Sequence, residues 1–387
     1  MKPTFTLLAL CVLPMLVGCG GGGSGSSSDG ATSSKQQVSS PTKATTVSAA
    51  ATPTPVRAGP TATSAPVTVA DTPTPGAGAQ TLTIHPGESI LAAVRGAPAG
   101  STLVVAPGLY GSLSLQASDV QGPITLLADV TGALTESGAE PVIIAAATAD
   151  IAAVQMSGVT GLTIDGFTLK GGREEAVLVS ASPQTTIRNC NVSGSLGDGV
   201  FVEGSDQVAV YNNLIVNNRR AGMRVWGGSD LQAVNNTVYG NHDNGLSIGD
   251  VQEPAASVAV INNIVDANLP SGIIVDATTA DYTGNFNLNA DGYGSDTPQG
   301  PNDIVGMDPV FIDARDGDFH LAQVSPAVDA GDSAIDADLL IALQQDTTQT
   351  DGSFDLTPID LGFHYPAPPP TPTPVPRNTK PKATPTP

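Results

Sequence analysis

The stretch RRAGMRVWGG, residues 219–228, gathers residue types that can recognise or transform a polar ligand. It contributes Arg219, Arg220 and Arg224 to an otherwise acidic region, together with the only tryptophan of the chain, Trp226. A guanidinium group binds hydroxyls or a carboxylate through a fork of donors, and an indole ring packs on C–H groups of a ligand. Whether these side chains act together depends on the fold that positions them.

Two columns of residues recur along the middle of the chain with a common spacing. Successive members lie 23 residues apart, except where one insertion lengthens the interval to 27. The first column is Ala176, Gly199, Gly222, Gly245 and Gly272, and the second is Asn189, Asn212, Asn235, Asn262 and Asn285. Two columns that keep one register and share one insertion indicate a repeat architecture.

Each 23-residue unit contains three short apolar runs and no helical period. In one unit the runs are residues 200–202, 208–211 and 214–216, with Asn212 at a sharp bend between the last two. Asparagine suits such a bend because it tolerates the left-handed conformation. The unit therefore predicts one coil of a parallel β-helix, with roughly 8–10 coils stacked at the spacing of β-strands.

The chain also resembles a known superfamily. The run GESILAAVRGAPAGSTLVVAPGLYG and the later run DPVFIDARDGDFHLAQVSPAVDAGD, with PIDLGFHY after it, are similar to the opening and closing segments of right-handed parallel β-helix proteins of the pectate-lyase-like superfamily. The resemblance implies an all-β, right-handed parallel β-helix over residues 80–302. It also implies a short N-terminal capping helix near Glu88–Val94 and a C-terminal capping segment over residues 303–365.

The two ends of the chain differ from this repeat region. Residues 1–18 have the character of a lipoprotein signal peptide, and LVGC resembles a bacterial lipobox that would place a lipid on Cys19. Residues 19–79 are a Gly/Ser/Thr/Pro-rich sequence that we expect to form a disordered linker, and residues 366–387 a disordered Pro-rich tail. We therefore expect an exported protein, anchored to the membrane of the bacterial cell envelope or surface by its N-terminal lipid.

The charge of the repeat region limits its partners. Between residues 81 and 364, 34 Asp and Glu face eight Lys and Arg. Nucleic acid is disfavoured as a partner, because binding it requires many cations. Cys190 is the one cysteine of this region, and we expect a small packed side chain.

Strand alternation predicts where the opening stretch points. If Met223 and Val225 face the core, Arg224 faces outward. Its equivalents in neighbouring coils, Phe201 and Ser247, would then continue the same outer column. We predict a carbohydrate-binding face, for a sugar or cell-envelope polysaccharide, made of Phe201, Arg219, Arg224, Trp226 and Ser247. The alternative is that the arginines only balance surface charge and that Trp226 packs under a loop.

Catalysis at the same face stays open as a second interpretation. A polysaccharide lyase would use Arg220 or Arg224 as a cationic base, with Asp198 and Asp243 holding Ca²⁺. A glycoside hydrolase would use Asp198 and Asp243 as paired carboxylates, with His242 in a segment that has a passing likeness to a polygalacturonase element. A structural or adhesive surface rod without catalysis is the third interpretation.

No other cofactor is expected, and calcium has one further possible site. Asp313, Asp316 and Asp318 could ligate Ca²⁺, although such Asp-Gly runs more often cap local backbone amides in turns.

Overall fold

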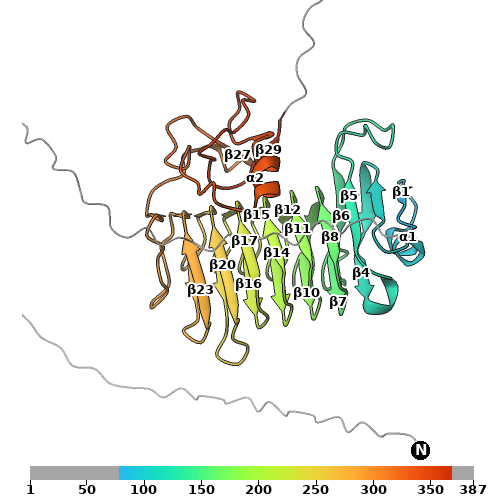
Figure 1. The fold of residues 1–387 in the computed structure, drawn as a ribbon, viewed down its shortest axis with the longest axis horizontal. Helices are drawn as coiled ribbons and strands as arrows, with labels where there is room; N and C mark the ends of the chain where they lie inside the picture. Colours follow the sequence, from blue (N-terminus) through green and yellow to red (C-terminus); the bar gives the residue numbers. More distant parts are fainter. Residues whose placement is uncertain (1–77, 368–387) are drawn as a thin grey trace, which may run out of the picture. The chain divides into compact units, whose positions relative to one another are not determined.

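The computed structural model describes residues 78–367, which form a right-handed parallel β-helix built from three sheets (Figure 1). Two of the sheets contain nine strands and the third contains seven, so the helix has about nine coils. The fold class and the number of coils predicted from the repeat are confirmed.

The three sheets are named A, B and C in the order in which each coil passes through them. Sheet A comprises β1 (Thr81–Ile84), β2 (Thr102–Val105), β5 (Ile124–Ala128), β8 (Leu162–Asp165), β11 (Thr186–Arg188), β14 (Ala209–Tyr211), β17 (Leu231–Val234), β20 (Ser257–Ile261) and β23 (Asp281–Asn285). Sheet B comprises β3 (Gly108–Gly111), β6 (Val142–Ala145), β9 (Thr168–Lys170), β12 (Asn191–Ser193), β15 (Leu214–Val216), β18 (Thr237–Tyr239), β21 (Ile264–Asp266), β24 (Leu288–Asn289) and β25 (Ile304–Val305). Sheet C comprises β4 (Leu113–Gln116), β7 (Val154–Ser157), β10 (Val177–Ser180), β13 (Val200–Glu203), β16 (Met223–Trp226), β19 (Leu246–Ile248) and β22 (Ile273–Val275).

Alternating side chains fill the interior of the helix. In β13 and β16, Val200, Val202, Met223 and Val225 are buried, and the residues between them face outward. Branched apolar side chains suit this position because they pack well on a pleated surface. Burial of each stabilises the fold by about 1.5–3 kcal/mol, so a charged residue at Val202 would disrupt the stack.

The bend between sheets A and B follows the predicted asparagine column in four coils. Asn189, Asn212, Asn235 and Asn262 all have positive φ, between 50° and 59°. The fifth member, Asn285, was predicted incorrectly: it pairs with Ile261, and Phe286 takes the left-handed bend with φ 54°. The cause is one extra residue in that coil, which shifts the register by one position.

A second asparagine ladder, one position later, is buried inside the bend. The backbone N–H and the side-chain amide of Asn213 both donate to Asn236 Oδ1 at 3.0 Å. The same pair of bonds joins Asn236 to Asn263 and Asn263 to Asn287. The ladder satisfies buried polar groups from coil to coil, which fixes the register of the stack.

A short helix lies at the N-terminal end, as predicted. Helix α1 (Ile90–Gly96) begins at Ser89, whose side chain accepts from the backbone N–H of Ala92 at 3.2 Å. Ile90 and Val94 are buried in the main core. A 3₁₀ turn, Ala117–Asp119, follows β4.

The segment after β25 lies along the flank of the β-helix at the bend between sheets A and B (Figure 1). It contains the antiparallel pairs β26 (Phe311–Asp313) with β27 (Asp318–Leu321) and β28 (Asp346–Thr347) with β29 (Tyr365–Pro366), and helix α2 (Ala337–Leu343). The asparagines at the bend between sheets A and B bind this C-terminal segment. Asn212, for example, accepts from the backbone N–H of His364 at 2.7 Å and donates to the carbonyl of His364 at 3.1 Å.

Candidate functional site

The outer face of sheet C carries the column expected from strand alternation. Phe201 in β13 pairs with Arg224 in β16, and Arg224 pairs with Ser247 in β19. Leu178 and Ile274 extend the column in the coils on either side. The repeat spacing therefore places these side chains next to one another, one per coil.

Arg224 is the centre of a polar network on this face. Its Nε donates to Asp198 Oδ2 at 2.8 Å and one Nη donates to Asp198 Oδ1 at 3.2 Å. The same Nη donates to Asp243 Oδ2 at 3.1 Å, and the other donates to Ser247 Oγ at 3.3 Å. Side chains from the coils on either side of Arg224 therefore bind one guanidinium group, so the network joins three coils.

The network is largely shielded from solvent. The side chain of Arg224 is 16% exposed and that of Asp198 is 3% exposed. Burial by itself would lower the pKa of Arg224, but hydrogen bonds and charges from Asp198 and Asp243 outweigh it and raise the pKa. Asp198 also accepts from the backbone N–H of Ala221 at 2.9 Å, so both of its oxygens are engaged.

An aromatic pair lies beside this network. The rings of Phe201 and Trp226 meet edge to face, with centroids 5.1 Å apart. The guanidinium carbon of Arg224 lies 5.9 Å from the centroid of the Trp226 ring. Arg224 and Trp226 therefore share one side of the sheet, and Trp226 is half-buried rather than enclosed.

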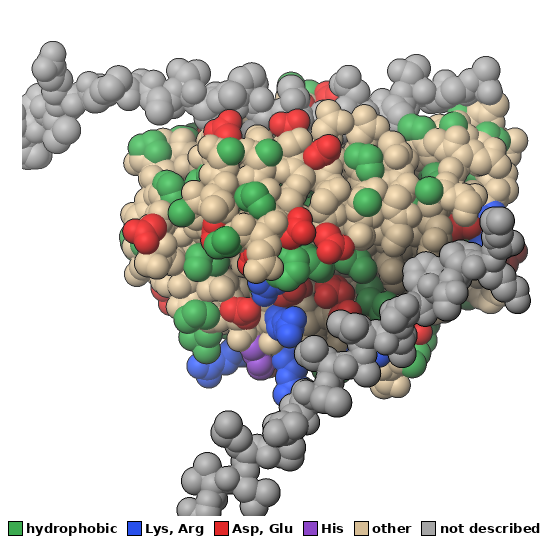
Figure 2. All heavy atoms as spheres, turned by 90° about the horizontal axis from the view of Figure 1, so that it is seen from below, with side chains coloured by type: hydrophobic (Ala, Val, Ile, Leu, Met, Phe, Trp, Pro, Cys, Tyr) green, Lys and Arg blue, Asp and Glu red, His purple; other side chains and the backbone are tan. Residues whose placement is uncertain are grey.

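The loops that enter sheet C supply exposed basic side chains. Arg219, Arg220 and His242 are exposed, and none of the three forms an ion pair with another residue in the described range. Figure 2 shows basic side chains and a histidine gathered beside acidic and hydrophobic side chains on one face. Since Arg224 is already bound by carboxylates, these outer side chains are the ones free to meet a ligand.

Glu175 is a further titratable group that the sequence prediction missed. It is buried in the loop before β10, one coil from Asp198, at the position equivalent to Asp198 in the repeat. Burial and the nearby charges of Asp198 and Glu174 raise the pKa of Glu175 to about 7. The 23-residue spacing from Glu175 to Asp198 is the signal that could have identified it.

The aspartates proposed as calcium ligands lie in a hairpin of the C-terminal segment. In the β26–β27 hairpin, Asp318 binds the ring of His320 at 2.6 Å, and His320 stacks on Tyr365.

Residues 78–367 contain no cluster of three or more His, Cys, Asp or Glu that could hold a metal ion. The calcium proposals for Asp313, Asp316 and Asp318 stay predictions. Cys19, the signal peptide and most of the linker and tail lie outside the described residues. Within the described range, no helix is both long and apolar enough to cross a bilayer.

Comparison with known proteins supports the fold. Residues 152–291 match a family model described as the right handed beta helix region. No curated protein sequence matches the chain.

Solved structures that resemble the chain include two lyases and an epimerase. A pectate lyase is 13% identical, with 66% of this chain and 92% of that chain covered and a TM-score of 0.41. An alginate lyase from Paenibacillus sp. is 15% identical, with 57% and 89% covered and a TM-score of 0.34. A periplasmic alginate epimerase is 13% identical, with a TM-score of 0.32; the match covers 48% of this chain and only 43% of the epimerase. At these identities and TM-scores, the likeness says nothing of the activity or substrate of this chain.

Proposed function

Since the chain is a right-handed parallel β-helix repeat protein, we propose that it binds carbohydrate on the outer face of sheet C. The observation that carries the proposal is the arrangement around Arg224. A fixed guanidinium group, the Phe201–Trp226 aromatic pair and the hydroxyl of Ser247 share one surface of neighbouring strands.

Each part of this surface has a role in holding a sugar. The half-buried Trp226 ring offers an apolar face on which sugar C–H groups pack. Arg219 and Arg220, exposed and without ion pairs in the described range, offer donors to hydroxyls or to a carboxylate. Asp198 and Asp243 hold Arg224 in one rotamer, so the surface is ordered before a ligand arrives.

Hydrolysis at this face is the second candidate, and Glu175 favours it. A glycoside hydrolase needs one carboxyl group that stays protonated near neutral pH and a second that is ionised. Glu175, with its pKa raised to about 7, fits the first role. Asp198 fits the second less well, because its two oxygens are occupied by Arg224 and by the backbone of Ala221. Binding without turnover is therefore the function favoured here.

We propose the cellular location of the protein from its sequence. The lipobox-like LVGC and Cys19 support lipid anchoring at the bacterial cell envelope or surface. A long Gly/Ser/Thr/Pro-rich linker would then separate the β-helix from the membrane.

A glycan array probed with the full chain tests the binding proposal. We expect retention on a subset of oligosaccharides, weakened at least about tenfold by the double substitution Arg219→Gln/Arg220→Gln. Arg315→Gln is the matched control, because Arg315 is an exposed arginine in the β26–β27 hairpin, away from sheet C. Equal loss in both variants would show that general charge, and not this face, governs retention.

Glu175→Gln separates binding from hydrolysis. If the protein only binds, the variant retains its glycan and no reducing ends appear with either protein. If it hydrolyses, the unmodified protein releases reducing ends from the retained glycan and the variant does not.

A further inference from the structure

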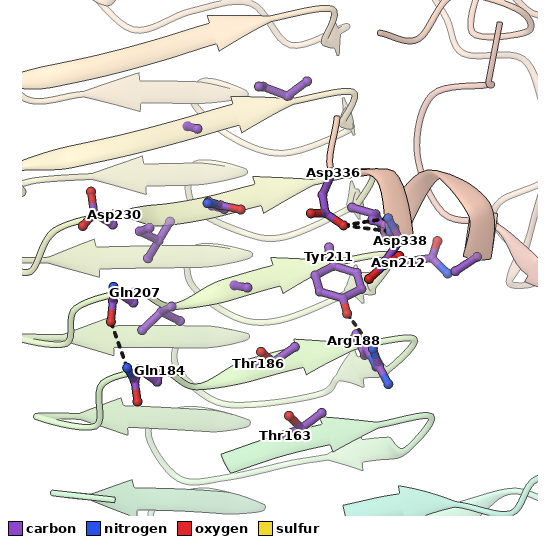
Figure 3. A pocket seen from close by; sticks show the side chains of 18 of the residues that line it. Thr163, Gln184, Thr186, Arg188, Gln207, Tyr211, Asn212, Asp230, Asp336 and Asp338 are labelled. Carbon is purple, nitrogen blue, oxygen red and sulfur yellow. Dashed lines mark hydrogen bonds between the residues drawn. The ribbon is translucent and has the colours of Figure 1, made fainter. Parts of the chain in front are cut away.

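The outer face of sheet A carries a groove of about 1030 Å³ that the sequence prediction did not identify (Figure 3). Its floor runs across the strands from β5 to β23. Helix α2 forms a wall, since Leu339 and Leu343 pack against Ala209, Tyr211 and Val234. The groove is thus distinct from the sheet C face and built by different coil positions.

The floor presents a row of hydroxyl groups. Thr125, Thr163 and Thr186 pair in register on β5, β8 and β11, so one hydroxyl recurs in each coil at about 4.8 Å. Figure 3 shows Thr163 and Thr186 on the groove floor. Thr186 is only 6% exposed, and its hydroxyl has no hydrogen-bond partner within residues 78–367. Its oxygen is not among the buried side-chain atoms that lack a partner, so the hydroxyl is open to the groove and a ligand group can bond to it.

Amides continue the polar lining along one side. Gln184 Nε2 donates to Gln207 Oε1 at 3.2 Å, and both side chains are exposed (Figure 3). The side-chain carbonyl of Gln184 can still accept a hydrogen bond from a ligand, and the side-chain NH₂ group of Gln207 can still donate to one.

The charge of the groove is negative. Five carboxyl groups line it, those of Asp230, Asp281, Asp336, Asp338 and Asp346. The single basic residue, Arg188, is occupied by Asp165 at 2.8 Å and by the Tyr211 hydroxyl at 2.7 Å.

Three of these carboxylates are available to a ligand. Asp230, Asp281 and Asp338 are exposed and make no side-chain hydrogen bond or ion pair within the described part of the chain. In Figure 3, Asp230 lies on the side of Gln184 and Gln207, and Asp338 lies on the helix side. The threonine row lies on the earlier strands β5, β8 and β11, whereas these carboxylates lie at the later strands β17 and β23 and on α2. The later end of the groove therefore repels uronates and phosphates and attracts cations.

We propose that the sheet A groove binds an oligosaccharide that carries protonated amino groups. Sugar hydroxyls donate to and accept from the threonine row and the glutamine pair, and ammonium groups lie against Asp230, Asp281 and Asp338. A basic peptide fits less well, because an extended peptide pairs with the edge of a sheet and the groove exposes only a sheet face.

Titration calorimetry with the full chain tests the proposal, using a glucosamine oligomer as the probe. We expect saturable binding that weakens with added salt, and weaker binding of the N-acetylated oligomer of equal length. Asp230→Asn/Asp281→Asn weakens binding by about tenfold or more, and Thr186→Val, which keeps the side-chain shape, also weakens it.

Asp296→Asn/Glu140→Gln is the matched control and leaves the affinity unchanged. Both residues are exposed and lie outside the groove, and Asp296 has a positive φ of 65° like the 55° of Asp230. The fluorescence of Trp226, on sheet C, stays constant during this titration, so failure here and failure of the sheet C proposal are distinguishable.

Three outcomes would overturn the proposal. The first is equal binding of the N-acetylated oligomer, which would remove the role of charge. The second is binding of hexalysine at equal affinity together with no effect of Thr186→Val, which would show a general acidic surface. The third is an affinity that the groove variants leave unchanged.

Discussion

Arg224 donates to both carboxylate oxygens of Asp198, at 2.8 and 3.2 Å, although the two residues lie 26 positions apart in the chain. One full coil and three further residues separate them, so the pair joins the outer face of one strand to the entering loop of the coil before. A two-point bond of this kind holds the guanidinium plane in one orientation. The geometry of the whole sheet C face depends on this pair.

Removal of Arg224 should destabilise the fold as well as the surface. Arg224→Met leaves the buried Asp198 carboxylate without its cation, which costs about 3–5 kcal/mol of unfolding free energy. Urea denaturation measures the change. Arg173→Met is the control, since Arg173 pairs with Glu174 on the surface and both side chains are 54% exposed; we expect a change below about 1 kcal/mol there. Equal effects would mean that the buried pair is no stronger than a surface pair.

Glu175 should make stability depend on pH. The pKa of Glu175 is raised from 4.5 to about 7 in the folded protein. Its contribution to the unfolding free energy is therefore fully present below pH 4.5 and is lost as the pH rises through 7. Glu175→Gln removes this titration, so the unfolding free energy of the variant should fall less between pH 5 and 8, by up to about 3 kcal/mol. Urea denaturation at several pH values tests this prediction. If the unfolding free energy changes with pH by the same amount in the unmodified protein and in Glu175→Gln, the raised pKa is refuted.

The buried asparagine ladder should contribute strongly to stability. Asn236→Ala leaves the backbone N–H and side-chain amide of Asn213 without their acceptor, and the expected loss is about 2–4 kcal/mol. Asn302→Ala is the control, because the Asn302 side chain is exposed and makes no hydrogen bond in the described structure. A loss below about 1 kcal/mol for Asn236→Ala would show that the ladder is dispensable.

Cys190 should be unreactive in the folded protein. Its side chain is fully buried, and burial raises the pKa of the thiol to about 12. A thiol reagent at pH 8 should label it only after denaturation, and Cys190→Ala identifies its share of the signal. Rapid labelling of Cys190 under native conditions would contradict the packing of this coil.

The repeat made much of the sheet C face predictable. A constant offset of 23 residues fixes the register of parallel coils, so Phe201, Arg224 and Ser247 could be aligned before any contact was known. Alternation along the strand then determined which of them face outward. Asn285 shows the limit of this reasoning, because a single added residue in its coil moved the bend to Phe286.

Other features depend on distances that a periodic pattern does not contain. The pKa of Glu175 follows from its burial near Asp198, and repeat spacing gives no measure of burial. The sheet A groove needs α2 as a wall, and α2 packs on strands more than 90 positions earlier in the chain. Contacts between residues so far apart in the chain arise from tertiary packing and leave no local signal in the sequence.

Titration of Trp226 fluorescence with a panel of neutral and uronic oligosaccharides is the most direct test of carbohydrate binding at sheet C. Trp226 is the only tryptophan, so any change reports on this face. We predict a saturable change with at least one glycan, weakened about tenfold or more by Arg219→Gln/Arg220→Gln and unaffected by Arg315→Gln. A constant signal across the panel, or a change that Arg219→Gln/Arg220→Gln leaves intact, would contradict the proposed site.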